Sequence, residues 1–325
     1  MINFGFKHKT GILLPISSLP SNYGIGSFGK NAFKFIDFLD ETKQKCWQIL
    51  PLNPTSYGDS PYQSPSSFAG NPYFIDLELL YEDGLLTKSE LDENICKDKK
   101  INYNWLFNTR IKVLKKAFNR FIKTDKYHKF IIKHNYWLND YAKFMVLKEN
   151  NNYCTWQEFT NLEIDEEMLE FWYFIQYKFD EQWNNILEYA HQKNIIIIGD
   201  MPIYVALDSV DVWKDKKVFL LDENNYPNSV AGCPPDDFTP LGQVWGNPLY
   251  NWEYLKENNF SWWVKRFKRN LELYDIIRID HFRGFSGYYS IPYLDNTAIN
   301  GHWEKAYGIE LFKEINNQFP NLKVI

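Results

Sequence analysis

The chain has 325 residues, of which 45% are hydrophobic and 24% charged, a composition typical of a globular protein with a sizeable core. Its formal net charge of -5 provides no basic face for nucleic acid or for an anionic membrane, and no apolar run is long enough to cross a bilayer. The 4 cysteines lie far apart in the sequence, which predicts neither a metal site nor disulfide bonds and favours a cytoplasmic location.

Four short segments are predicted to form buried parallel strands: residues 11–16, 46–50, 195–199 and 276–279. Each is almost continuously apolar, as expected for a strand covered on both faces. Helical patterns precede the second and third segments, with apolar residues three or four apart in residues 32–42 and 172–187. This alternation indicates an α/β fold of βα units, arranged as a parallel sheet or a barrel.

Two long segments interrupt the alternation. Residues 85–171 contain charged helical patterns, including 104–123 and 135–149, and predict a helical insertion packed on the main domain. Residues 208–252 are rich in proline, glycine, aspartate and aromatic residues and show little periodicity. Because long loops at the carboxyl ends of barrel strands carry binding sites, we expect this segment to be an irregular subdomain over the active site.

Two segments after the second predicted strand, residues 57–64 and 68–73, mix turn-forming residues with aromatic, amide and hydroxyl side chains. Such loops suit a site for sugars, because rings cover the apolar sugar faces and polar side chains bond the hydroxyl groups. An ordered surface loop is the alternative interpretation. The aromatic content of 18% likewise allows two interpretations, a compositional bias or sugar-binding rings.

Residues 232–250 combine two adjacent prolines with glycines and aromatic side chains. Gly242 and Gly246 provide hinge positions, while Phe238 and Trp245 provide flat faces for stacking. A loop of this composition can cover a cleft and exclude water.

Two predicted strands end in aspartate. Arg278 and Asp280 are two residues apart in the sequence IIRIDHFRGF, so they share a strand face, and the guanidinium would hold the carboxylate ionised, as a nucleophile requires. A structural ion pair is the alternative, but the polar residues that follow favour a site. Asp200 ends the strand before the sequence MPIYV. A lone strand-end aspartate is commonly a cap or turn residue, but two neighbouring ones would form an acidic mouth.

Taken together, several segments resemble the 4-α-glucanotransferases known as amylomaltases or disproportionating enzymes, a branch of the α-amylase superfamily. The segments are GILLPISSLPSNYGIGSFG, YGDSPYQS, FAGNPY, IIGDMPIYVALDSVDVW, AGCPPDDF, GQVWGNPLYNW and IIRIDHFRGF. The resemblance implies a (β/α)8 barrel of the TIM type with inserted helical subdomains, of which residues 1–325 are a part that stops after the start of the fifth strand. It implies activity on α-1,4-glucans without a cofactor or metal.

Carried over residue by residue, the resemblance also implies a set of site residues. Asp280 would be the nucleophile and Arg278 would keep it ionised. The implied substrate-binding residues are Asp200 and His281 beside the scissile bond, Tyr57 and Tyr62 around the donor sugars, and Asp236, Gln243 and Trp245 in a mobile loop over the acceptor side.

The implied reaction is a retaining double displacement that moves α-1,4-glucan segments to the 4-hydroxyl of an acceptor, glucose or a maltooligosaccharide, through a covalent glycosyl-aspartate. Its second carboxyl group, a glutamate, is expected beyond Ile325, because neither Glu304 nor Glu310 is predicted to end a strand. The sequence therefore predicts an inactive fragment of the enzyme. An α-glucan hydrolase and a non-catalytic glucan-binding protein remain the alternatives.

Overall fold

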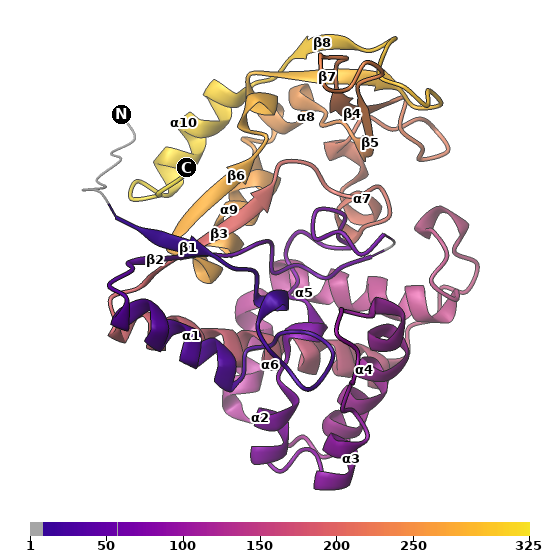
Figure 1. Ribbon diagram of the computed structural model, residues 1–325. Helices are drawn as coiled ribbons and strands as arrows, with labels where there is room; N and C mark the ends of the chain where they lie inside the picture. The colour runs from indigo at the N-terminus through magenta and orange to yellow at the C-terminus, as the bar shows by residue number, and fades with distance from the viewer. Residues whose placement is uncertain (1–8, 57) are drawn as a thin grey trace.

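A computed structural model describes residues 9–56 and 58–325 (Figure 1). A parallel sheet lies at its centre, with four strands: β1 Gly11–Leu13, β2 Cys46–Gln48, β3 Ile196–Pro202 and β6 Ile276–Asp280. The strand order is β1-β2-β3-β6, and an isolated parallel bridge between Ile277 and Val324 adds a further pairing beside β6. The prediction of an α/β fold with neighbouring parallel strands is confirmed.

The bounds of all four strands differ from the prediction, most clearly at β1 and β3. β1 stops at Leu13, because Pro15 lacks a backbone N–H and the chain turns into a 3-10 helix after it. β1 is also not buried on both faces, since Leu13 is 54% exposed at the edge of the described sheet. By contrast, β3 continues through Asp200 and is buried along its middle.

Long helices connect these strands. They are α1 Lys30–Glu41 between β1 and β2, α6 Glu166–Gln192 before β3, α9 Ser261–Leu273 before β6, and α10 Gly308–Gln318 near the end of the described chain. α1 buries Ala32, Ile36 and Leu39, which recur at helical spacing and form one apolar face. Both predicted helices are confirmed: residues 32–41 of the range 32–42 lie in α1, and 172–187 lies within the longer α6. Short 3-10 helices occupy Ile16–Ser18, Pro72–Phe74, Trp156–Glu158, Lys216–Val218 and Phe282–Phe285.

A group of helices between β2 and β3 lies below the sheet in Figure 1. Besides α6, its members are α2 Leu77–Glu82, α3 Lys88–Asp92, α4 Tyr103–Phe118 and α5 Asp125–Asn150. For the predicted helices 104–123 and 135–149, the end of the first and the start of the second are wrong. α4 stops at Phe118, and α5 starts early because the Thr124 side chain caps it by accepting a hydrogen bond from the backbone N–H of Tyr127.

An antiparallel sheet lies above the parallel one in Figure 1, in the order β5-β4-β7-β8. Its strands are β4 Ser229–Cys233, β5 Gln243–Pro248, β7 Gly287–Pro292 and β8 His302–Lys305, and the short helices nearby are α7 Val210–Lys214 and α8 Trp252–Glu257. Residues 208–252, which the sequence predicts to be irregular, thus contain two strands and a helix. The local sequence pattern does not reveal the two strands, because β4 pairs with the sequence-distant β7 and because the register between β4 and β5 shifts.

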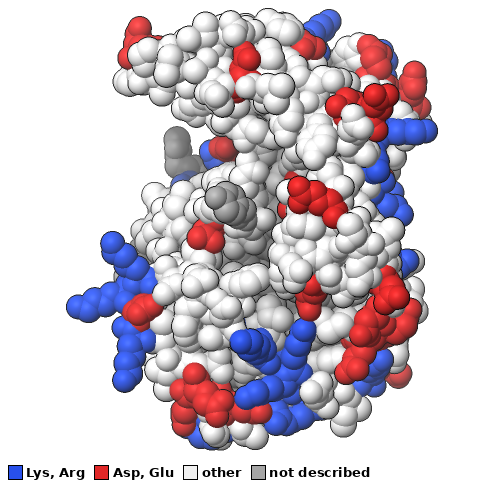
Figure 2. All heavy atoms as spheres, turned by 90° about the vertical axis from the view of Figure 1, so that its right-hand side faces the viewer, with Lys and Arg blue, Asp and Glu red and all other residues white. Residues whose placement is uncertain are grey.

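The surface carries both signs of charge. Figure 2 shows lysine and arginine interspersed with aspartate and glutamate on the face to the right of Figure 1, with mostly white atoms and a few acidic side chains around its hollowed middle. Among the helices of the described residues, none is long and apolar enough to cross a membrane.

Candidate active site

A cavity of about 350 Å³ opens at the carboxyl ends of β3 and β6. Parts of the chain that are distant in sequence line it: Ser60, Tyr62, Gln63, Pro202, Ile203, Tyr204, Trp245, Asn247, Asp280 and His281. The register of the two parallel strands places Asp200 opposite Arg278 and Pro202 opposite Asp280. The polar strand ends therefore meet at one edge of the sheet, where α/β enzymes place their sites.

The guanidinium of Arg278 bridges the carboxylates of Asp200 and Asp280. Its Nη1 donates to Asp200 Oδ1 at 2.6 Å, and its Nη2 donates to Asp280 Oδ1 at 2.7 Å. Burial lowers the pKa of Arg278, but the hydrogen bonds to the two carboxylates outweigh this effect and raise it, so the guanidinium stays charged. The Asp280 side chain is 41% exposed and lines the cavity. One cation thus lies between two carboxylates, one of which faces the open space.

Asp200 is buried beneath the cavity and held by two donors. Besides the bond from Arg278, its Oδ2 accepts a hydrogen bond from the Tyr62 hydroxyl at 2.7 Å. Burial raises the pKa of the Asp200 carboxyl, while these two hydrogen bonds oppose the shift. Burial and the bond to Asp200 raise the pKa of Tyr62, so its phenol remains a donor at neutral pH. This contact ties the loop after β2 to the ends of β3 and β6.

Buried side chains also fix the backbone at the end of β3. Arg266 of α9 is 2% exposed and donates to the carbonyl oxygens of Pro202 and Ile203. The Tyr250 hydroxyl donates to the same Ile203 carbonyl at 2.7 Å. These bonds satisfy carbonyl groups at the point where strand pairing stops, so two backbone positions that line the cavity are rigidly placed.

His281 follows Asp280 in a left-handed conformation, with a φ of 53° that is uncommon for a residue with a Cβ. Its ring packs edge-on against that of Trp245, with 4.9 Å between the ring centroids. Gly284 in the turn that follows packs closely on Ile203, since an added Cβ would lie 2.7 Å from Cδ1 of Ile203 and that side chain would have to shift. Burial lowers the pKa of His281, although Asp280 opposes this shift, so the neutral imidazole is favoured.

The structure brings together six of the predicted site residues: Asp280, Arg278, Asp200, Tyr62, His281 and Trp245. Tyr57 falls outside the described residues. Asp236 is exposed, and hydrogen bonds from the backbone and side chain of Thr239 lower its pKa. Gln243 accepts a hydrogen bond from the indole N–H of Trp245 at 3.0 Å. Neither Asp236 nor Gln243 is among the residues that line the cavity.

Four polar side chains of the cavity were not singled out from the sequence: Ser60, Gln63, Tyr204 and Asn247. Each belongs to one of the segments that carry the family resemblance, so a signal was present. In irregular loops, however, no spacing rule tells which side chains point inward, and only the tertiary structure selects them.

The structure also places the two glutamates considered as the second carboxyl group. Glu304 lies within β8, opposite Tyr288 of β7, and Lys305 follows it as the last residue of the strand, so Glu304 does not end a strand, as expected. Its side chain accepts a hydrogen bond from the Tyr288 hydroxyl at 2.9 Å, and Glu310 lies in α10 as expected. Neither lines the cavity, so Asp280 is the one carboxylic acid among its described lining residues.

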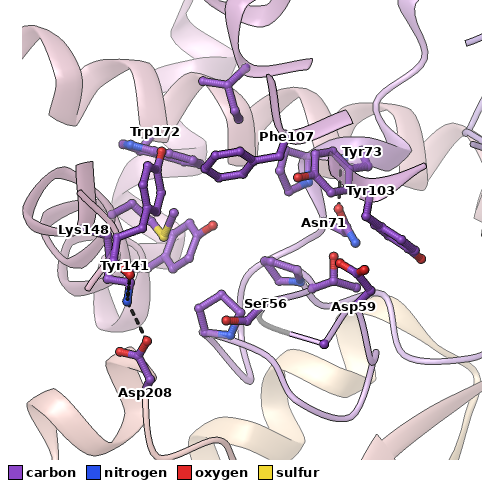
Figure 3. Close-up of a pocket in the computed structure, with 18 of the residues that line it drawn as sticks. Ser56, Asp59, Asn71, Tyr73, Tyr103, Phe107, Tyr141, Lys148, Trp172 and Asp208 are labelled. Atoms are coloured by element: carbon purple, nitrogen blue, oxygen red, sulfur yellow. Dashed lines mark hydrogen bonds and ion pairs between the residues drawn. The ribbon is translucent and has the colours of Figure 1, made fainter. Parts of the chain in front are cut away.

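A larger cavity of about 570 Å³ lies between the helices and the loop after β2 (Figure 3). Its walls are largely aromatic, with Phe107 of α4, Tyr141 of α5 and Trp172 of α6. An ion pair between Lys148 Nζ and Asp208 Oδ2, 2.6 Å apart, lies at one end. Since Asp280 lines the smaller cavity and Arg278 joins it to Asp200, that cavity is the candidate active site. No cluster of three or more histidine, cysteine, aspartate or glutamate side chains that could hold a metal occurs in the described part of the chain.

The fold and the cavity define an α/β protein with its candidate active site at the carboxyl end of a parallel sheet. Comparison with known families gives the closer assignment, since the family described as 4-alpha-glucanotransferase matches residues 14–325. The chain belongs to the 4-α-glucanotransferase family, whose members are glycosyltransferases acting on α-1,4-glucans.

Individual relatives agree with this assignment. The 4-alpha-glucanotransferase of Clostridium butyricum is 49% identical over 328 residues, covering 95% of this chain and 67% of the relative. That of Streptococcus pneumoniae is 43% identical, covering 98% and 67%. The solved amylomaltase from Streptococcus agalactiae in complex with acarbose is 42% identical, with a TM-score of 0.92 over 98% of this chain and 68% of that one. The chain spans about two thirds of the length of these relatives.

Proposed function

We propose that the protein transfers segments of α-1,4-glucans to the 4-hydroxyl of an acceptor glucan by a retaining double displacement. Maltooligosaccharides and other α-1,4-glucans are the proposed donors, and glucose or a maltooligosaccharide is the proposed acceptor. The observation that carries the proposal is the guanidinium of Arg278, which joins Asp200 and Asp280 at the base of the cavity in a member of this family.

In the proposed first step, an oxygen of Asp280 attacks the anomeric carbon of the donor, and the bond from this carbon to the departing glucan oxygen breaks. A second carboxyl group gives its proton to that oxygen. In the second step the acceptor 4-hydroxyl attacks the same carbon, the second carboxylate takes the hydroxyl proton, and Asp280 leaves. Two inversions preserve the configuration. Arg278 would hold the Asp280 carboxylate in place before the attack, because its guanidinium pairs with the carboxylate at 2.7 Å.

The remaining predicted residues receive binding roles. Asp200 and His281 would hold the donor glucose beside the bond to be broken, and Tyr62, with Tyr57 by the resemblance, would contact the sugars around it. Trp245 would cover the acceptor side of the cavity. Asp236 and Gln243 would belong to the same mobile loop. If this loop covers the cavity, it excludes water from the glycosyl-enzyme and so favours transfer over hydrolysis.

A retaining reaction needs two carboxyl groups about 5–5.5 Å apart. Because Asp280 is the one carboxylic acid among the described residues that line the cavity, we propose that a further part of the enzyme supplies the second. The parallel sheet would then be part of a (β/α)8 barrel with a helical insertion at 85–171 and the segment 208–252 over the site. No cofactor is required. The 4 cysteines are free, which supports a reducing compartment such as the cytoplasm.

Incubation of the full-length enzyme with maltotriose tests the proposal. Transfer produces glucose together with maltodextrins longer than the substrate. Hydrolysis without elongation would replace the transferase with an α-glucan hydrolase, and glucan binding without turnover would indicate a non-catalytic binding protein.

A further inference from the structure

Two side-chain amides join three parts of the cavity wall. Gln63 Nε2 donates to the backbone carbonyl of Trp245 and to Asn247 Oδ1, both at 3.2 Å. Asn247 Nδ2 donates to the carbonyl of Val205 at 2.8 Å and lies 3.5 Å from Gln63 Oε1. Asn247 is only 5% exposed. The pair thus connects the loop after β2 with β5 and with the segment that follows β3.

The contact falls where β5 lacks its regular pairing with β4. β5 pairs with β4 at Val244 and again at Pro248, and the register shifts between these two positions. The residues from Trp245 to Asn247 lie in this interruption, which has the character of a β-bulge. The Trp245 carbonyl accepts a hydrogen bond from Gln63, a partner outside the sheet, so a side-chain amide holds the bulged backbone.

Each end of this connection reaches a part of the proposed catalytic machinery. Gln63 directly follows Tyr62, whose hydroxyl donates to Asp200 beneath the cavity. On the other side, the Trp245 ring packs edge-on against His281. A shift of the bulge would therefore move the Trp245 ring relative to the carboxylate end of the cavity, without removing any group proposed to cleave the donor.

We propose that Gln63 and Asn247 are positioning residues that hold Trp245 over the cavity and thereby set how the glycosyl-enzyme divides between an acceptor sugar and water. This inference rests on the proposed transferase function. With the amide pair intact, the Trp245 ring stays over the cavity. The acceptor sugar then binds against a fixed ring, and water is excluded. With the pair broken, the bulge relaxes, the acceptor binds less well, and water takes a larger share of the intermediate.

The test uses the substitution Gln63→Glu in the full-length enzyme, because glutamate has the same shape but no amide N–H groups. It places acceptor oxygens against the Trp245 carbonyl and Asn247 Oδ1, so both hydrogen bonds are lost. With maltotriose as the substrate, we expect the ratio of hydrolysis to transfer to rise about fivefold or more, the factor for one lost neutral hydrogen bond. The acceptor KM for glucose should rise in parallel, and maltotriose consumption should fall less than the ratio changes.

Asn247→Asp removes the donor to Val205 and should change the ratio in the same direction. The double variant should be no worse than the more affected single variant, because the two amides act as one unit. The control is Gln157→Glu, since Gln157 Nε2 makes one amide contact, to the carbonyl of Asn225 at 3.3 Å, and Gln157 does not line the cavity. It should retain the wild-type ratio.

Unchanged ratios in both cavity variants, in enzyme that still consumes maltotriose, would overturn the inference. An equal loss of transfer and hydrolysis would overturn it too, because it would show that the amides act on the donor. Failure of the proposed function has a separate signature, since it is seen in the wild-type enzyme as hydrolysis without elongation.

Discussion

At the scale of single residues, the contact between Arg278 and the two strand-end carboxylates shapes the chemistry of the candidate site. Asp200 is buried and pinned by two donors, whereas Asp280 shares the same cation but faces the cavity. The two aspartates therefore have different environments despite lying on adjacent strands. This difference supports a binding role for the first and a nucleophilic role for the second.

The substitution Asp280→Asn should abolish turnover of maltotriose, lowering kcat at least about a thousandfold, because an amide is too weak a nucleophile to form the glycosyl-enzyme. Glucan binding should persist, since the shape of the site is retained. Rates from product analysis and binding by calorimetry check both parts. Asp222→Asn, in an exposed turn, is the matched control, and activity surviving in Asp280→Asn would exclude Asp280 as the nucleophile.

At the scale of elements, helices α5, α6 and α9 meet around a buried histidine. His134 of α5 is 1% exposed and lies near Asp180 and Glu272. Arg269 of α9 forms ion pairs with both of these carboxylates, at 2.9 and 3.3 Å, and so offsets their negative charge near His134. Burial, and next the charge of Arg269, lowers the pKa of His134 from 6.5 to about 3, so the helices pack around a neutral imidazole.

This packing predicts a pH-dependent stability. The unfolded chain takes up a proton on His134 below pH 6.5, whereas the folded protein does so only near pH 3, so stability is lost as the pH falls through this window. From pH 7 to pH 5 the loss from His134 should be about 2 kcal/mol. Urea unfolding of the wild type and His134→Gln at both pH values measures it. An equal pH dependence in the two proteins would contradict the prediction.

A second prediction at this scale concerns the packing of β3 against the residue that follows helix α9. Gly199 lies against the ring of Tyr274, and an added Cβ would lie 2.1 Å from its Cγ. Gly199→Ala should therefore lower the free energy of unfolding by roughly 1–3 kcal/mol through overpacking. If the ring is the obstacle, Tyr274→Leu should cost less in the Gly199→Ala background than in the wild type, and additive losses in a double-mutant cycle would show that it is not.

At the scale of the whole molecule, the cavity is formed by parts of the chain that lie far apart in the sequence. The loop after β2, the ends of β3 and β6, and β5 of the second sheet each contribute side chains, and Asp280 is the one acid among the described residues that line it. The proposed reaction needs two carboxyl groups, so the described cavity provides half of the catalytic pair.

Residues 1–325, purified alone, should therefore show no turnover of maltotriose above background, while the full-length enzyme elongates it. Chromatography of the maltodextrins measures the difference, and circular dichroism establishes whether the shorter chain is folded. Turnover by residues 1–325 would mean that a carboxyl group within them completes the pair. Glu304 would then be the first candidate for substitution.

Much of the parallel sheet could be predicted because its strands are continuous apolar runs, and such runs are a local signal. β4 and β5 were missed, since β4 pairs with the sequence-distant β7 and the β4–β5 pairing carries a register shift, which no local pattern shows. At the site, Arg278 and Asp280 were found because two residues apart on a strand share a face. Gln63 and Asn247 were not found, because their contact joins the loop after β2 to the sequence-distant strand β5.

The sequence by itself determined the strand-end aspartates, the apolar strands and helices around them, and the segments that resemble the 4-α-glucanotransferases, because each is written in residues close together along the chain. Only the tertiary structure decided that Arg278 also bridges to Asp200, that Tyr62 holds Asp200 from another loop, and that an amide pair anchors Trp245. These contacts depend on strand register and on loop backbone, which packing sets over long sequence separations.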